Sequence, residues 1–510
     1  MANQCPISSQ FVVFIIITYF MFILGELIRP LPRPLPNDIL SLHIATRLRT
    51  DPNSIKLASS DYGNLVQENS IAVLYPSSID DIVTLIKFAN NCSTPLISIS
   101  ARGHGHSVRG QAMARDGVVV DMGALSENGI GIRVSSNRNP SSGYYYADVV
   151  SWTDYLYLTV GGTLSNAGIS GQSFLHGPQI SNVLELDVVT GKGDFITCSK
   201  NMNSELFLAV LGGLGQFGII TRARIILQKA PTRAKWVRLL YSDFSIFTRD
   251  QEHLISTNIP SYVEGSLITH MSPPNNWRSS FYSPSHYSKI TSLLKSNNGH
   301  LYSIEVVKYY DDQSADTIDE ELQSLLKDLG FNPGFIFKKD VALIDFLGRV
   351  GNIDNQNSEG QLETHPWLNL FVPKSRILDF NAGVFLDIIA RHNQTSGPIL
   401  FYPFNRNKWD DRMSAVIPDE DIFYTLGLLH SSRPDQSGNF DKLNNEIIEF
   451  CEKAGIKIKQ YLPHYKSKKD WMKHYGPKWN TFQETKTKYD PKMILSPGQR
   501  IFNSVDSSDI

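Results

Sequence analysis

The feature that most constrains the fold is a loop of small and basic residues directly after a short apolar run. The run 95–99 (PLISI) is typical of a buried strand, and it continues into the segment 100–112, SARGHGHSVRGQA. Its three glycines let the backbone approach a ligand closely, and consecutive exposed N–H groups can bind an anion. Two arginines add positive charge. The loop therefore predicts a site for a phosphate-bearing ligand, with an imidazole beside it.

The histidines of this loop, His104 and His106, allow two other interpretations. A His-x-His pair can bind a metal ion, because neutral imidazole is a common ligand. No cluster of carboxylates or cysteines with ligand spacing lies nearby, so we expect no metal. A glycine-rich surface loop with incidental histidines is the default for this segment alone, and the later motifs argue against it.

A βαβ pattern surrounds the loop. Strands are predicted at 71–75 and 96–97, with a helix between them that starts at Ser77 or Ser78 and carries two aspartates in its first turn. A helix is expected over 37–64, before this unit, and a strand over 118–122, after it.

A second loop of small residues covers 151–171. Asp154 stands between Thr153 and Tyr155, where loss of water would raise its pKa and suit it to proton transfer. A helix N-cap is the alternative role for this aspartate. The glycines that follow again favour close approach of backbone to a ligand.

The segment 213–218 satisfies the pattern GxGxxG. That fingerprint marks a dinucleotide site only where it leaves a strand and opens a helix. Here the alternating, β-branched run 219–227 follows, which predicts a strand. The motif is therefore not a helix-based phosphate site.

The later part of the chain mixes helix and strand patterns. Its clearest helix is expected at 314–329, where an apolar stripe ends at Gly330, and an alternating strand is expected at 456–462. Glu264 lies in an apolar setting after the composition changes near residue 230.

The order of these motifs resembles that of the vanillyl-alcohol-oxidase-type (PCMH-type) FAD enzymes, and within them of the plant cytokinin dehydrogenases. The resemblance covers nearly all of the chain after residue 37. It implies an α+β fold, with a two-lobed PCMH-type FAD-binding domain over 41–229 that is completed by 462–510. An α+β substrate cap of antiparallel sheet plus helices, over 230–461, is inserted between them.

By the same resemblance, His106 carries FAD covalently. The other cofactor contacts that it implies are Ala101, Gly103, His104, Gly105, Ser107, Gln111, Asp154, Thr159, Ser165, Ile169, Ile219, Tyr461, Ser496 and Gln499. It gives Asp154 and Glu264 catalytic roles, with Glu264 holding the adenine ring, and it implies substrate contacts at Asp154, Glu264, Trp367, Asn369 and Leu462.

The implied activity is oxidative cleavage of the N6 side chain of isopentenyladenine-type or zeatin-type cytokinins. The products are adenine and an unsaturated aldehyde, with hydride passing to the flavin N5 and Asp154 handling the amine proton. A quinone-like acceptor or oxygen would reoxidise the flavin. The alternatives are another covalent-FAD oxidase of the superfamily, acting on an alcohol or carbohydrate, or a non-catalytic secreted purine-binding protein. Relatives in which FAD is attached at two residues use a cysteine in the second loop. This chain has no cysteine between Cys92 and Cys198, which argues against that group of relatives.

The N-terminal residues predict passage through the secretory pathway. An apolar run over 11–24 favours a signal peptide or signal anchor within 1–24, and a Pro-rich linker follows over 25–40. Asn91 and Asn393 begin N-glycosylation sequons. The extracellular space is the expected destination, with the endoplasmic reticulum or vacuole as alternatives.

Cysteine content and net charge limit the crosslinks and binding partners that we expect. The four scattered cysteines give no disulfide framework, and a net charge of −2 over 510 residues gives no reason to expect nucleic acid. We expect a monomer by default.

Overall fold

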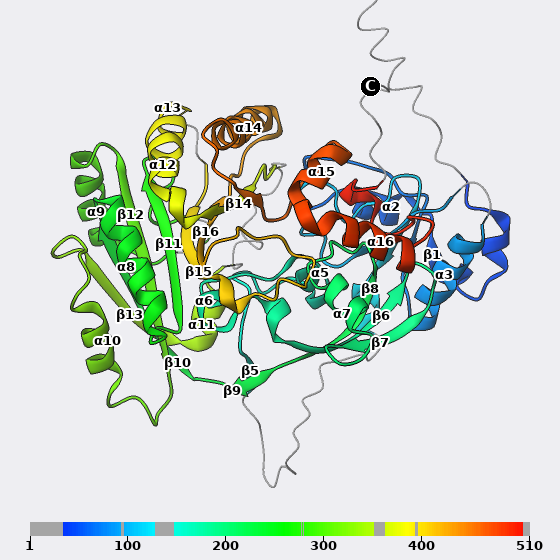
Figure 1. Ribbon diagram of the computed structural model, residues 1–510, viewed down its shortest axis with the longest axis horizontal. Helices are drawn as coiled ribbons and strands as arrows, with labels where there is room; N and C mark the ends of the chain where they lie inside the picture. Colours follow the sequence, from blue (N-terminus) through cyan, green and yellow to red (C-terminus); the bar gives the residue numbers. More distant parts are fainter. Residues whose placement is uncertain are drawn as a thin grey trace, which may run out of the picture.

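The computed structural model describes residues 34–92, 96–127, 147–276, 278, 280–350, 363–392 and 396–502. Two lobes lie on the right of Figure 1 and a larger cap lies on the left. The predicted leader (1–24) falls outside the described residues, as do most of the linker and Asn393. Within the described residues, no helix is long and apolar enough to cross a bilayer.

The first lobe is built on a four-stranded sheet of order β1-β2-β4-β3, in which β4 runs parallel to β2 and β3. Its strands and helices are β1 (Leu48–Arg49), β2 (Ala72–Leu74), α3 (Ile79–Asn91), β3 (Ile99–Arg102), β4 (Val118–Asp121) and α4 (Gly123–Glu127). A capping box between Ser78 and Asp81 starts α3, as the two serines and two aspartates predicted. The apolar face of α3 then packs on the sheet.

The helix predicted over 37–64 is wrong. Two short 3₁₀ segments, β1 and one short helix occupy this range instead: η1 (Asn37–Ser41), η2 (Ala45–Arg47) and α2 (Pro52–Ala58). Leu48 and Arg49 pair with β2, so sheet formation overrides the helical pattern there. Pro52 cannot continue a helix, and it instead begins α2 with Asp51 as the N-cap.

The second lobe contains an antiparallel sheet of order β7-β6-β8. Its elements are α5 (Val160–Asn166), α6 (Ser173–His176), η3 (Gln179–Asn182), β6 (Val183–Thr190), β7 (Phe195–Ser199), α7 (Ser204–Val210) and β8 (Gly218–Ile225). The GxGxxG segment leads into β8 and not into a helix, which confirms the sequence interpretation. The pair β5 (Ala147–Val149) and β9 (Leu227–Lys229) lies where this lobe meets the cap (Figure 1).

The cap contains one eight-stranded antiparallel sheet of order β13-β10-β12-β11-β15-β16-β14-β17. Its strands are β10 (Arg233–Tyr241), β11 (Tyr262–Thr269), β12 (His300–Tyr310), β13 (Ile336–Ala342), β14 (Leu368–Pro373), β15 (Ile399–Asn405), β16 (Ile422–Leu428) and β17 (Lys459–Gln460). The strand predicted at 456–462 is thus shorter, because only Lys459 and Gln460 pair with β14.

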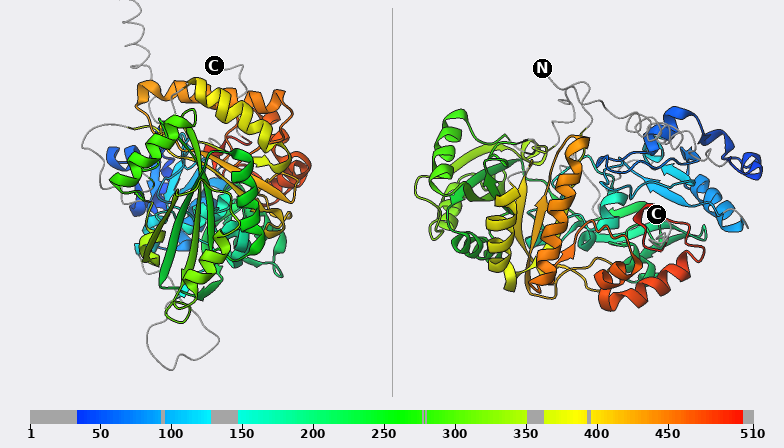
Figure 2. Two further views of the ribbon diagram at one scale, coloured as in Figure 1. Left: turned by 90° about the vertical axis from the view of Figure 1, so that its left-hand side faces the viewer. Right: turned by 90° about the horizontal axis from the view of Figure 1, so that it is seen from above.

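Most cap helices pack on the sheet face turned away from the lobes. Figure 2 shows the rod formed by α12, η5 and α13 beside α14 along one end of the sheet. The helices on this face are α8 (Phe244–Thr257), α10 (Ile318–Leu326), α12 (Ile377–Phe380), the π-helix η5 (Asn381–Ile389), α13 (Ala390–His392) and α14 (Ser437–Lys453). On the other face, one end of the sheet is covered by α9 (Pro284–Ser296) and α11 (Leu343–Leu347). The rest of this face is turned toward the lobes.

The helix predicted at 314–329 is shorter than expected, since α10 starts at Ile318. Asp311 accepts hydrogen bonds from the backbone of Gln313 and the side chain of Ser314, which hold the preceding residues in turns. The short 3₁₀ segments η4 (Lys374–Arg376), η6 (Arg406–Lys408) and η7 (Pro434–Gln436) connect other elements of the cap.

The C-terminal segment returns to the lobes. Its helices are α15 (Lys468–Tyr475), η8 (Gly476–Lys478), α16 (Trp479–Tyr489) and η9 (Pro497–Gln499). Of these, α15 and α16 pack with α7 around a shared aromatic core, and η9 lies against β3. Leu495 forms a parallel bridge with Ile99 in β3. The end of the chain therefore extends the first lobe at the strand that leads into the glycine-rich loop.

Candidate active site

A cavity of about 1490 Å³ lies where the two lobes, the cap and the C-terminal segment meet. It is lined by every cofactor residue that the sequence predicted, namely Ala101, Gly103, His104, Gly105, His106, Ser107, Gln111, Asp154, Thr159, Ser165, Ile169, Ile219, Tyr461, Ser496 and Gln499. Trp367, Asn369 and Leu462 line the same cavity, whereas Glu264 does not. The structure thus brings residues from both ends of the chain to one site.

His106 lies in an aromatic stack. Its ring is 4.0 Å from that of Tyr62, with 13° between the planes, and Tyr62 stacks in turn on His365 at 4.1 Å. Tyr155 contacts His106 at 4.7 Å. His104 is exposed. The imidazole that packing holds in a defined orientation is therefore that of His106.

The shape of the glycine-rich loop depends on Asp61, which the sequence analysis did not identify. This carboxylate accepts hydrogen bonds from the Gly110 N–H at 2.6 Å and the Ser107 hydroxyl at 2.8 Å. Burial raises the pKa of Asp61 despite these bonds. Gly105 has φ +64, and a Cβ there would lie 2.3 Å from the Arg102 guanidinium, so a larger residue would strain the loop and displace Arg102.

The two loop arginines have partners within the protein. Arg102 lines the cavity but donates to the Ser60 carbonyl at 2.8 Å, and Arg109 pairs with Asp441 of α14 at 2.6 Å. The sequence predicted both as charges for a phosphate. Arg109 instead joins the loop to α14 of the cap.

The second loop is in contact with the first. A Cβ on Gly103 would lie 2.1 Å from the Thr159 hydroxyl oxygen, so the backbone of one loop touches the side chain that caps α5 in the other. Tyr461 accepts a hydrogen bond from the Gly168 N–H at 3.4 Å, and burial raises the pKa of Tyr461 to about 12. Asp154 lies before α5, whose N-cap is Thr159, so the N-cap alternative for Asp154 is wrong.

The cavity fits FAD. Its volume exceeds the roughly 300–1,000 Å³ of most ligand pockets, which leaves room for a dinucleotide and a substrate together. Glycine backbone in both loops can lie against a ligand. The amide oxygen of Gln499 is buried and has no hydrogen-bond partner among the described residues. A ligand group that donates to this oxygen would satisfy it.

Asp154 is held by two groups of the cap. Its Oδ1 lies 2.7 Å from the phenol oxygen of Tyr262, and its Oδ2 lies 3.2 Å from a guanidinium nitrogen of Arg278. The side chain of Asp154 is 19% exposed, and both Asp154 and Arg278 line the cavity. The carboxylate can therefore meet a ligand while the cap fixes its orientation.

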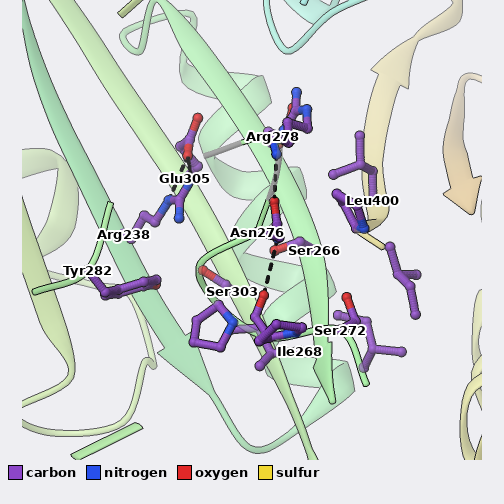
Figure 3. A pocket seen from close by; sticks show the side chains of 16 residues that line it. Arg238, Ser266, Ile268, Ser272, Asn276, Arg278, Tyr282, Ser303, Glu305 and Leu400 are labelled. Atoms are coloured by element: carbon purple, nitrogen blue, oxygen red, sulfur yellow. Dashed lines mark hydrogen bonds and ion pairs between the residues drawn. The ribbon is translucent and has the colours of Figure 1, made fainter. Parts of the chain in front are cut away.

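Glu264, on β11, lies behind this layer. Both of its oxygens accept from the Arg278 guanidinium, and one also lies 2.7 Å from the phenol oxygen of Tyr262. Burial raises the pKa of Glu264. It lines a separate cavity of about 30 Å³ (Figure 3). The structure does not place Glu264 against the large cavity, because Arg278 and Tyr262 occupy its carboxylate. The contact with the adenine ring that the resemblance implied for Glu264 stays a prediction, because the side chain lines only the smaller cavity.

Several site residues could not be found in the sequence. Tyr62, His365, Tyr402 and Arg278 all line the cavity. Strand periodicity offered a signal for Tyr402 alone, which projects from β15 on the side that faces the lobes, whereas Arg278 and His365 lie outside the strands. Nothing in the sequence indicates that Tyr62 stacks on His106.

Comparisons with known proteins agree with this site. A family model described as "Cytokinin dehydrogenase 1, FAD and cytokinin binding" matches residues 231–502, and one described as "FAD binding domain" matches 70–138. Cytokinin dehydrogenase 3 of Arabidopsis thaliana is 53% identical, over 93% of this chain and 94% of the relative. Cytokinin dehydrogenase 4 of Arabidopsis thaliana is 49% identical, over 91% of this chain and 94% of the relative. Cytokinin dehydrogenase 5 of Oryza sativa subsp. japonica is 47% identical, over 90% of this chain and 91% of the relative.

A solved structure of a VAO-type flavoprotein from Myceliophthora thermophila C1 matches with a TM-score of 0.59 at 16% identity, over 84% of this chain and 79% of that one. This likeness supports the predicted two-lobed fold with an inserted cap. Fold and site together define an FAD-dependent oxidoreductase. The chain belongs to the cytokinin dehydrogenase family.

Proposed function

We propose that the protein oxidises N6-substituted adenines at the cavity between the lobes and the cap, with FAD attached covalently through His106. One observation carries this proposal. His106 and Asp154 line the same cavity, and Tyr155, the neighbour of Asp154, contacts the His106 ring. An attachment group and a carboxylate base are thus held together in one site.

Bound FAD supplies the hydride acceptor for the reaction. A cytokinin loses hydride from the side-chain carbon attached to N6 and a proton from N6 itself, and the C–N bond becomes an imine. Asp154 accepts a hydrogen bond from the N6–H and then takes this proton. Water cleaves the imine to adenine and an aldehyde.

The remaining walls of the cavity suit such a substrate. Trp367 directly precedes β14, Asn369 lies in β14 and Leu462 follows β17, so aromatic, amide and aliphatic groups line the cavity from the cap side. We assign these three residues to substrate binding. Arg278 presents the only guanidinium that lines the cavity from the described part of the cap, and it fixes Asp154 at the same time.

We further propose that a quinone-like acceptor or oxygen takes the electrons from the reduced enzyme, that no metal takes part, and that the protein works as a monomer. One observation bears on the metal alone: the described residues contain no group of three His, Cys, Asp or Glu side chains that could hold a metal ion. Gel filtration with light scattering tests the monomer, and activity after dialysis against a chelator tests the metal.

We also propose that the protein enters the secretory pathway. The apolar N-terminal run supports a leader, and Asn91 is exposed at the end of α3, where a glycan could be attached. The second sequon, at Asn393, is also proposed as a glycosylation site. Expression in plant cells, followed by glycosidase treatment and a mobility shift on a gel, tests these assignments.

The activity is tested with isopentenyladenine and a quinone dye. We expect dye reduction, with adenine and an unsaturated aldehyde as products. Alcohols and monosaccharides serve as the comparison panel, and turnover of these in place of the adenine would contradict the proposal. Acid precipitation adds a second readout, since covalent FAD stays in the pellet and gives it a yellow colour.

A further inference from the structure

Three charged groups converge on the phenol oxygen of Tyr262. It lies 2.7 Å from Asp154 Oδ1, 2.7 Å from Glu264 Oε2 and 2.7 Å from a guanidinium nitrogen of Arg349. Tyr262 is 2% exposed, and burial raises its pKa well above the ordinary value, so it keeps its proton. These contacts join the carboxylate on the cavity to the carboxylate behind it.

The number of hydrogens decides which protonation state this arrangement favours. A phenol donates one hydrogen and accepts up to two hydrogen bonds. If Asp154 and Glu264 are both ionised, the single phenol hydrogen serves one of them, and the other oxygen faces the phenol oxygen with no hydrogen between. If one proton is added to Asp154, the acid group donates to Tyr262, Tyr262 donates to Glu264, and Arg349 donates to Tyr262. All three contacts are then satisfied.

We propose that Tyr262 is a positioning residue that makes Asp154 and Glu264 share one proton, so that the pair can hold the proton removed from the substrate amine. The inference rests on the proposed function and deepens it. Asp154 accepts the proton from N6, and the second carboxylate stabilises the product state through the phenol. Glu264 thus contributes to catalysis without touching the substrate.

The surrounding charges are consistent with this role. The groups facing the pair are Arg278, at 3.2 Å from Asp154 and bidentate on Glu264, and Arg349, at 3.5 Å from Glu305. Arg238 pairs with Glu305 at 2.7 Å on the far side of the small cavity, as Figure 3 shows. Three carboxylates thus balance three guanidinium groups before the pair takes up the proton of the amine.

Two phenols also face the pair, and neither titrates with it. Burial raises the pKa of Tyr461 to about 12 and that of Tyr402 well above its ordinary value. The small cavity of about 30 Å³ is lined by Glu264, Arg278 and Glu305, and it is large enough for a water molecule. Neither of these phenols therefore supplies a proton to the pair.

The test uses the full-length holoenzyme and the variant Tyr262→Phe, which removes only the hydroxyl. Flavin reduction by isopentenyladenine is followed in single-turnover experiments without oxygen, between about pH 5 and pH 9, and acid-stable flavin is measured in parallel. We expect unchanged flavin content and a reduction rate about tenfold lower, since Asp154 loses the phenol that aligns it as the proton acceptor. We expect the pKa that defines the acidic limb of the pH–rate profile to fall by about one unit. The reason is that Asp154 and Glu264 lose two hydrogen bonds when they share a proton and only one when both are ionised.

Tyr302→Phe is the matched control. Its hydroxyl donates to Asn381 at 2.8 Å in the buried cap core, and it makes no contact with the pair. This variant should keep the parent rate and profile. If it shows the same losses as Tyr262→Phe, or if Tyr262→Phe keeps the parent rate and limb, the proposal is overturned.

A second variant keeps the question answerable if Tyr262→Phe does not fold. Glu264→Gln removes the second charge at the same size, so the acidic limb should move in the same direction with a loss of rate. If the pKa of the acidic limb is the same in Glu264→Gln as in the parent, the proposal is overturned. A parent enzyme that shows no flavin reduction by isopentenyladenine refutes the proposed function and with it this inference, whereas a reactive parent with unaffected variants refutes the inference alone.

Discussion

The imidazole of His106 stacks on the phenol ring of Tyr62, with ring centroids 4.0 Å apart and 13° between the planes. Backbone hydrogen bonds hold this pair, since the Tyr62 N–H donates to the Gly105 carbonyl at 2.8 Å and the Gly63 N–H donates to the Ser107 carbonyl at 3.0 Å. The ring that would carry FAD is thus oriented before any cofactor arrives.

Replacing Tyr62 tests this orientation. Tyr62→Leu should lower the fraction of protein with acid-stable flavin several-fold, because the imidazole loses the ring that fixes its plane, worth about 0.5–1.5 kcal/mol. Tyr62→Phe should keep the attachment, since it keeps the ring. The measurement is the ratio of flavin to protein absorbance after acid precipitation. Tyr287→Leu, on α9 of the cap, is the control. Equal flavin content in Tyr62→Leu and the parent would remove the stack from this role.

The second prediction concerns Asp154. Asp154→Asn should slow flavin reduction by isopentenyladenine about 10²–10⁴-fold, because the amide cannot take the amine proton. Covalent flavin content should not change, since Asp154 contacts the cap through Tyr262 and Arg278 and is not part of the His106 stack. Stopped-flow absorbance measures the rate. Undiminished reduction by the variant would show that another group takes the proton.

The third prediction concerns the charge balance behind the cavity. Arg278→Gln leaves the buried Glu264 without its bidentate partner, so the free energy of unfolding should fall by about 3–5 kcal/mol. The double variant Arg278→Gln/Glu264→Gln should recover part of this loss, because it removes the uncompensated charge as well. Denaturant unfolding of the parent, the two single variants and the double variant measures the coupling. Strictly additive losses would mean that the two side chains do not stabilise each other.

The fourth prediction is a pH dependence of stability. Hydrogen bonds from Ser77 and Ser78 and the charge of Arg47 outweigh burial and lower the pKa of Asp81 from its ordinary value of 3.8. A lowered pKa in the folded state means that the stabilisation is complete above pH 3.8 and is lost as the pH falls through the lower folded value.

Asp81→Asn should therefore lower the free energy of unfolding by about 0.5–2 kcal/mol at neutral pH, as for other helix caps. The difference from the parent should shrink as the pH falls below 3.8. Thermal unfolding at several pH values measures it. Asp80→Asn, whose side chain is 74% exposed, is the control and should behave like the parent throughout. A difference that grows at low pH would contradict the assignment.

Local patterns predicted much of this molecule. The capped start of α3 was visible because Ser78 and Asp81 act within one helical turn. The strand β8 was visible because β-branched alternation outweighed the GxGxxG match. The small residues of two loops predicted a ligand site, and the resemblance to the cytokinin dehydrogenases then selected His106 and Asp154 within these loops, which both line the cavity.

What could not be predicted depends on contacts between distant segments. His365 stacks on Tyr62 because its N–H donates to the Gly63 carbonyl, a bond between two separate loops. Arg278 and Arg349 meet Glu264 and Glu305 only because the cap strands bring them together, while an isolated arginine in a sequence indicates a solvated surface. The same lack of tertiary information made the helix over 37–64 a wrong prediction, since β1 pairs with β2.

The measurement that tests the central claim most directly is the mass of the peptide that carries the flavin. Trypsin cleavage after Arg102 and Arg109 releases the segment 103–109, which contains His104 and His106, and fragmentation separates the two histidines. We predict that the FAD mass lies on His106. Flavin on His104, or an unmodified peptide together with free FAD in the acid supernatant, would contradict the assignment of His106 as the attachment site.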